Sequence, residues 1–106
     1  MKDNATITHK QMVSLDVFCK DNDIHPELIK IDVEGAEIDL LLGAKNVLLK
    51  HRPIIFLSLH PQHIEETNQS LSDLRSYLEE VNFRCLTIDR KDNNDFHQKE
   101  CFLLPN

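Results

Sequence analysis

The stretch LIKIDVEGAEIDLLL, residues 28–42, decides the predicted fold. Its first half is a short run rich in β-branched residues, which predicts a strand, and the carboxylates Asp32, Glu34 and Glu37 follow directly after it. Beyond them, apolar residues recur at helical spacing, which predicts one helix over residues 35–50. The stretch therefore indicates a strand that passes through an acidic turn into a helix.

A second strand is predicted after this helix, in the run PIIFLSLH at residues 53–60. The run is almost entirely apolar until Ser58, and such continuous hydrophobicity is typical of strands that are covered on both faces, as in parallel sheets. The two strands and the helix between them are therefore predicted to form a parallel β-α-β unit.

The flanking segments predict further elements. Residues 1–12 show no clear periodicity and are interpreted as an extended lead-in, while Ser14 is the expected N-cap of a short amphipathic helix in SLDVFCKDND. The segment SLSDLRSYLEEV, residues 70–81, predicts a third helix whose leucines form one stripe. The runs FRCLTID and ECFLLP then predict two antiparallel strands joined by the exposed loop RKDNNDFHQK.

Composition limits the functional classes. A chain of 106 residues fits one domain with one modest core. Its net charge of −6 disfavours nucleic-acid binding, which depends on clustered Lys and Arg. The apolar runs are far shorter than the roughly 20 residues of a membrane span, and no signal sequence opens the chain, so a cytoplasmic location is expected. The three widely spaced cysteines, Cys19, Cys85 and Cys101, are expected to be reduced and buried.

In open parallel sheets, ligands bind beyond the carboxyl ends of the strands. Asp32 ends the first predicted strand and His60 ends the second, so Asp32, Glu34 and His60 are expected to converge on one rim. The plainer interpretation of the carboxylates is a capped and solvated helix start, in which Glu37 lies on the first turn near the positive end of the helix dipole.

A metal site is a weaker interpretation of the same region. His60 and His63 form an H-x-x-H pattern, and with Asp32 they leave open a metal-dependent hydrolase. Pro61 interrupts the helical geometry that would align the two imidazoles, so no metal ligand is assigned. The other histidines are expected to be surface or loop residues: His9, His25, His51 and His97.

In combination, the motifs carry a family resemblance. LIKIDVEGAEIDLLLGAKNVL followed by RPIIFLSLHP resembles the central and C-terminal part of FkbM-type S-adenosylmethionine-dependent methyltransferases, and VSLDVFC resembles that family's upstream segment. The resemblance covers about residues 12–104 and implies an α/β, three-layer Rossmann-like methyltransferase fold, of which this chain would supply the fourth through seventh strands. Such enzymes hold the methyl donor through a glycine-rich loop, and no G-x-G occurs here. Residues 1–106 are therefore expected to be a single, truncated domain without the donor-binding half.

The resemblance also implies roles for three residues. Asp32 would bind the cofactor S-adenosylmethionine beside its sulfonium, Glu34 would accept the proton of an acceptor hydroxyl, and His60 would bind the acceptor or share that proton. The implied reaction is O-methylation of a sugar, polyketide or other small metabolite. A non-catalytic binding or assembly module that keeps the fold is the alternative.

The missing half has a physical consequence. In the related fold the strand ending at Val33 is central, and without its neighbour it would present an unpaired apolar edge. The sequence therefore predicts a homodimer, or pairing with a separate N-terminal half, through this edge.

Overall fold

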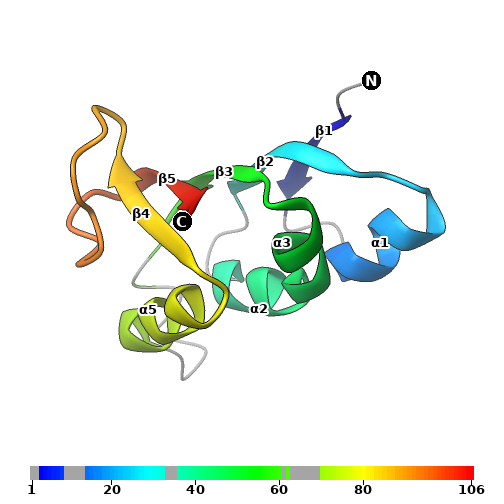
Figure 1. The fold of residues 1–106 in the computed structure, drawn as a ribbon. Coiled ribbons are helices and arrows are strands. Elements are labelled where there is room, and N and C mark those ends of the chain that lie inside the picture. Colours follow the sequence, from blue (N-terminus) through cyan, green and yellow to red (C-terminus); the bar gives the residue numbers. More distant parts are fainter. Residues whose placement is uncertain (1–2, 9–13, 33–35, 61, 63–69) are drawn as a thin grey trace.

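The computed structural model describes residues 3–8, 14–32, 36–60, 62 and 70–106 (Figure 1). They form one mixed sheet in the order β1-β2-β3-β5-β4. The strands are β1 (Asp3–Thr8), β2 (Pro26–Asp32), β3 (Ile54–Ser58), β4 (Phe83–Thr87) and β5 (Glu100–Pro105). The helices are α1 (Leu15–Asp21), α2 (Glu37–Leu42), α3 (Lys45–His51) and α5 (Leu71–Glu80).

The predicted parallel unit and the antiparallel pair are both confirmed. Strands β2 and β3 run parallel, with Leu28 opposite Ile54 and Ile31 opposite Leu57. Strand β5 is antiparallel to both β3 and β4. The carboxyl ends of β2 and β3 therefore lie at the same edge of the sheet as the start of β5.

The prediction for the first residues was wrong. Residues 3–8 form strand β1, which runs parallel to β2 from the Asp3–Pro26 pair to the Thr8–Asp32 pair. Strand β2 is consequently paired on both sides, and the unpaired edge predicted for it is absent. Among the described strands, β1 and β4 are the edges of the sheet.

The single helix predicted over residues 35–50 is two helices, separated at Gly43 and Ala44. The break has a cause in α1. The Asp16 amide donates to the Gly43 carbonyl at 2.9 Å, and the Asp16 carboxylate accepts from the amides of Asn46 and Val47 at 3.0 and 2.9 Å. The start of α1 thus takes the hydrogen bonds that a continuous helix would make here and caps α3.

The close approach of α1 also explains the glycine at the break. A Cβ atom at position 43 would lie 3.1 Å from the Ser14 Cβ atom. The predicted N-cap is confirmed, because the Ser14 hydroxyl accepts from the Val17 amide at 3.2 Å. A small residue at 43 therefore lets the capped end of α1 reach the break.

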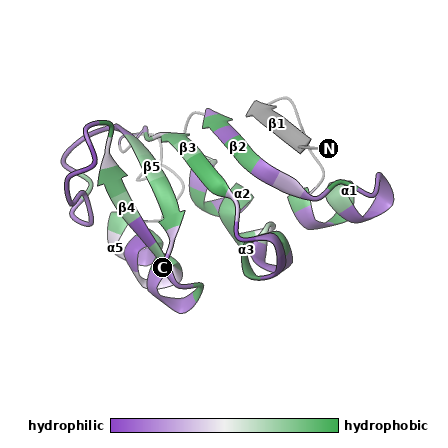
Figure 2. Cartoon of the chain, turned by 45° about the horizontal axis from the view of Figure 1, so that its top comes forward, coloured by the Kyte–Doolittle hydropathy of each residue, from purple (hydrophilic) through white to green (hydrophobic). Residues whose placement is uncertain are grey.

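The core lies between one face of the sheet and the helices, which Figure 2 shows gathered on one side. Alternate residues of β2, β3, β4 and β5 are buried there, and they are Ile29, Ile31, Ile55, Leu57, Phe83, Cys85, Cys101 and Leu103. The predicted stripe of α5 joins this core through Leu74 and Leu78. The described part of the chain therefore has two layers.

The expected covering of both sheet faces is not found among the described residues. On the face away from the helices, Leu28 and Ile54 are 42% and 43% exposed, and the rings of Phe56 and Phe102 meet edge to face with their centroids 5.3 Å apart. No described helix packs on these side chains. This face remains apolar and open to solvent.

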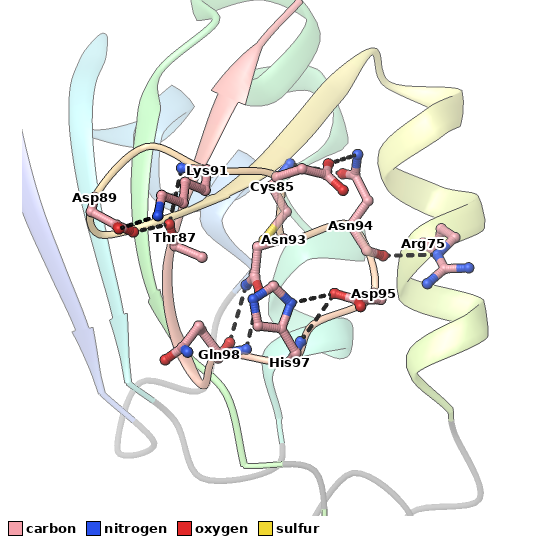
Figure 3. Close-up of polar contacts among 11 residues, drawn as sticks. Arg75, Cys85, Thr87, Asp89, Lys91, Asn93, Asn94, Asp95, His97 and Gln98 are labelled. Carbon is pink, nitrogen blue, oxygen red and sulfur yellow. Dashed lines mark hydrogen bonds and ion pairs between the residues drawn. The ribbon is translucent and has the colours of Figure 1, made fainter.

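The loop between β4 and β5 is more ordered than an exposed hairpin loop (Figure 3). Asn93 is fully buried, and its side chain donates to the Gln98 carbonyl at 3.1 Å and accepts from the Gln98 amide at 3.0 Å. It also donates to the Cys85 sulfur at 3.4 Å, while Arg75 of α5 donates to the Asn94 carbonyl. These contacts tie the loop to β4 and α5.

The cysteine prediction is confirmed, because Cys19, Cys85 and Cys101 are all buried thiols.

None of the helices in the described ranges has both the length and the apolar composition that a membrane span needs.

Tyr77 provides a test of how α5 is attached. Its buried hydroxyl donates to the Leu41 carbonyl at 2.6 Å, and burial, together with the nearby Asp16 and Glu80 charges, raises the pKa of Tyr77 to about 12. The folded state favours the neutral phenol, so its contribution to stability is complete below pH 10 and is lost as the pH rises from 10 towards 12.

We expect Tyr77→Phe to lower the free energy of unfolding by about 0.5–1.5 kcal/mol at neutral pH. The variant should also lose the part of the alkaline destabilisation that Tyr77 causes, and Tyr77 is the sole tyrosine of the chain. Urea unfolding followed by circular dichroism between pH 8 and pH 11 measures both effects. Parallel stability curves for the two proteins above pH 10 would contradict the assignment.

Candidate functional site

The carboxyl ends of β2 and β3 bring Asp32 and His60 together, as predicted. Asp32 is the last residue of β2, and His60 follows β3 by two residues. The distance from His60 Nε2 to the nearer carboxylate oxygen of Asp32 is 3.7 Å. The Asp32 side chain is 53% exposed and the His60 side chain 30%, so both can be reached from solvent. Glu34, the third predicted member of the rim, lies outside the described residues.

Glu37 lies on the first turn of α2, as predicted. The plainer interpretation of a solvated helix start is wrong for this residue, because its side chain is fully buried. One of its carboxylate oxygens lies 2.8 Å from His60 Nδ1. A buried carboxylate is costly unless it is paired, and the imidazole supplies that pairing.

These contacts fix the orientation of the His60 ring. The Glu37 carboxylate accepts a hydrogen bond, so Nδ1 is the donor, and in the neutral ring Nε2 is the basic nitrogen. Nε2 is on the side of the ring that faces Asp32. The arrangement therefore holds a histidine between a buried carboxylate and an exposed one, with its basic nitrogen at the rim.

The start of β5 completes the rim. The β3–β5 pairing continues beyond Ser58, because the Leu59 amide donates to the Lys99 carbonyl at 2.8 Å. The rim borders a cavity of about 320 Å³, whose lining is Asp32, Ser58, Leu59, His60, Gln62, Lys99 and Glu100. The residues that line it carry more negative than positive charge, which favours cationic groups.

Lys99 and Glu100 were not identified from the sequence. Lys99 ends the charged predicted loop and Glu100 begins the predicted strand ECFLLP, and only the antiparallel pairing of β5 with β3 brings them to this edge. The pairing of the last strand with β3 was not predicted, and it is the signal that could have placed them here, because a strand antiparallel to β3 must begin where β3 ends. For Glu37 no local signal exists, since its partner is 23 residues away.

The metal interpretation gains no support from the described residues. Within the ranges that the structure covers, no group of three or more His, Cys, Asp or Glu side chains is arranged to hold a metal ion. His63, which the hydrolase alternative needs, lies outside those ranges.

Comparison with known proteins gives one match. The family model described as the methyltransferase FkbM domain matches residues 2–85, which include β1 to β3, the first part of β4 and the residues Asp32, Glu37 and His60. No curated protein and no solved structure matches the chain.

The contact between Glu37 and His60 can be tested without a substrate. We expect the ring nitrogen shifts of His60, measured by long-range 1H–15N correlation, to show a proton fixed on Nδ1 in the neutral ring. Glu37→Gln removes the ionised acceptor and should shift this tautomer balance towards Nε2–H.

Asp39→Asn is the matched control, because Asp39 is an exposed carboxylate in the same first turn of α2. It should leave the His60 shifts unchanged. If the two variants behave alike, Glu37 does not orient His60.

Proposed function

Because the chain belongs to the FkbM methyltransferase family, we propose that it uses S-adenosylmethionine to methylate a hydroxyl of a sugar, polyketide or other small metabolite. The observation that carries this proposal is the position of His60. Its Nδ1 lies 2.8 Å from the buried Glu37, and its Nε2 lies at the rim of a cavity beside Asp32. A base held in this way suits the removal of a proton from an acceptor hydroxyl.

In this proposal His60 is the catalytic base and Glu37 is a positioning residue. A hydroxyl placed in the cavity would give its proton to His60 Nε2, and the charge that forms on the imidazole would be stabilised by Glu37 and Asp32. Glu34 remains a proposed second proton acceptor, as the family resemblance implies. The acceptor's other groups would contact Ser58 and Gln62, which line the same cavity.

The described residues fit one end of the methyl donor. When bound, S-adenosylmethionine supplies an activated methyl group on a cationic sulfonium. Asp32 and Glu100 place negative charge at the cavity where that cation would lie, and Lys99 is the nearby cation that suits a carboxylate. A cavity of about 320 Å³ is at the lower limit of sites for ligands of this size. The chain has two glycines, Gly35 and Gly43, so it has no glycine-rich loop for the adenosine end.

The fold of the proposed enzyme is a single three-layer, Rossmann-like domain. The parallel β1-β2-β3 order and the antiparallel β5 and β4 support the Rossmann-like part of this proposal, and the exposed apolar side chains of the open face support a third layer. The non-catalytic module remains the alternative, and the missing glycine-rich loop is the observation that favours it. Whether the chain binds S-adenosylmethionine distinguishes the methyltransferase from the non-catalytic module.

Calorimetric titration with S-adenosylmethionine and S-adenosylhomocysteine tests the proposed function. We expect binding of both, and we expect Asp32→Ala to weaken binding of the cationic donor by roughly ten- to a hundredfold, the equivalent of about 1.5–3 kcal/mol for a charge-assisted contact. Neutral S-adenosylhomocysteine should be affected less, because its sulfur carries no charge.

Asp21→Ala is the control, since Asp21 is an exposed carboxylate at the end of α1. It should bind both ligands as the wild type does. No binding of either ligand at millimolar concentration would favour the non-catalytic module, and equal affinities for Asp32→Ala and wild type would remove Asp32 from the site.

We also propose that the chain self-associates along the outer edge of β1. None of the described strands pairs with that edge, and an open strand edge is a template for pairing with another chain. Sedimentation velocity over a range of protein concentrations should show a dimer. A monomer at all concentrations would contradict the proposal.

The variant Ile54→Lys distinguishes association through the β1 edge from association through the open face of the sheet. Ile54 points away from the helices and is 43% exposed, so lysine is tolerated there, and association through β1 should be unchanged. Loss of the dimer in this variant would move the contact to the open face.

A further inference from the structure

Two histidines meet at the opposite end of β2 from the candidate site. His25 directly precedes β2, and His51 is the last residue of α3, immediately before the turn into β3. Both line a cavity of about 490 Å³ between α1 and α3. Their rings lie edge to face with centroids 4.8 Å apart. The proposed methyltransferase chemistry makes no use of this pair.

The distance between the two facing nitrogens is informative. His25 Nδ1 lies 3.4 Å from His51 Nε2. Hydrogen bonds from a ring N–H are usually shorter, about 2.7–3.2 Å between the heavy atoms. Two imidazole nitrogens that each bind a tetrahedral zinc ion at about 2.0–2.1 Å are separated by roughly 3.4 Å. The observed distance therefore matches a pair of metal ligands better than a hydrogen bond.

The contact with Asp23 fixes the tautomer of His25 that can bind a metal ion. Its carboxylate lies 3.1 Å from His25 Nε2, so Nε2 is the donor and Nδ1 of the neutral ring carries the lone pair. Metal-binding histidines commonly donate their other N–H to a carboxylate, which fixes the tautomer and the ring orientation. The nitrogen directed at His51 is thus the one able to bind a cation.

We propose that His25 Nδ1 and His51 Nε2 bind one first-row transition-metal ion, of the class of Zn²⁺, Cu²⁺ or Ni²⁺. Imidazole suits these ions, whereas Mg²⁺ and Ca²⁺ prefer oxygen ligands. In the described residues no group of three or more ligating side chains is arranged to hold a metal ion, so the proposed site has two protein ligands and water would complete its coordination. The site is open to solvent, since the His25 side chain is 58% exposed.

The bound ion would join two parts of the chain that are separate in sequence. His25 and His51 are 26 residues apart, and they connect the turn before β2 with the end of α3. An ion that binds only the folded chain stabilises it by a free energy that grows with the logarithm of the ion concentration once that concentration exceeds the dissociation constant. The bound ion would therefore hold the segment before β2 and the end of α3 together, at the end of the sheet that is remote from His60.

The test uses the purified full chain, stripped of metal with a chelator and titrated with Zn²⁺ by calorimetry. We expect one ion per chain and an increase in the melting temperature. His25→Ala and His51→Ala should each weaken Zn²⁺ binding at least tenfold. Electron paramagnetic resonance of the Cu²⁺ complex should show two imidazole nitrogens in the wild type and one in either variant.

His97→Ala is the matched control. His97 also contacts a carboxylate, that of Asp95, but no imidazole among the described residues pairs with it, so its loss should leave Zn²⁺ affinity unchanged. His60→Gln serves as a second control for the candidate site. Absence of Zn²⁺ binding, or binding that His60→Gln abolishes and His25→Ala does not, would overturn the proposal.

His25→Ala keeps the test valid if His51→Ala does not fold, because His25 is the more exposed of the two and lies outside the helices and strands. Circular dichroism of each variant establishes that it is folded. The outcome is independent of the proposed methyltransferase function, since none of these measurements uses the methyl donor.

Discussion

The burial of one face of the sheet is the constraint on which the rest of the structure depends. Alternate residues of β2 and β3, such as Ile31 and Leu57, are wholly buried beneath the helices. Their period of two directs the intervening residues to the opposite face and fixes the register of both strands. A shift of one residue would expose the core positions, so the strands end together and hold Asp32 and His60 at one edge.

Within this frame, His60 stands between two carboxylates in different surroundings. Glu37 is fully buried and 2.8 Å from the imidazole, whereas Asp32 is half exposed and 3.7 Å away. The buried contact is short and sheltered from solvent, so it determines the orientation of the ring. The exposed carboxylate adds charge to the cavity without holding the ring. One acidic partner thus positions the histidine, and the other remains accessible to a ligand.

Local sequence patterns predicted β2, β3, the N-cap at Ser14 and the strand pair at the C-terminal end, because these features depend on nearby residues. The break between α2 and α3 could not be predicted in this way. Its cause is the backbone and carboxylate of Asp16, which are about thirty residues distant in sequence. Strand β1 was missed for a similar reason, since residues 3–8 become a strand by pairing with β2.

In the candidate site, too, one feature could be predicted from the sequence and another could not. The meeting of Asp32 and His60 followed from the rule that parallel strands end at one edge. The burial of Glu37 did not, because a carboxylate on the first turn of a helix is normally solvated and stabilised by the helix dipole alone. Its burial requires His60, which follows β3, as a partner, and no local sequence pattern links the two residues.

The composition of the run PIIFLSLH, residues 53–60, bears on the open face of the sheet. Its continuous hydrophobicity suits a strand that is buried on two sides, and the described helices cover one of them. On the other side Ile54 is 43% exposed, and Phe102 is partly shielded by Phe56 and by the Arg90 guanidinium, 5.3 Å from its ring centroid. Such contacts reduce the exposed apolar area without removing it. The strand thus has the composition of a three-layer sheet, which is the architecture proposed for the enzyme.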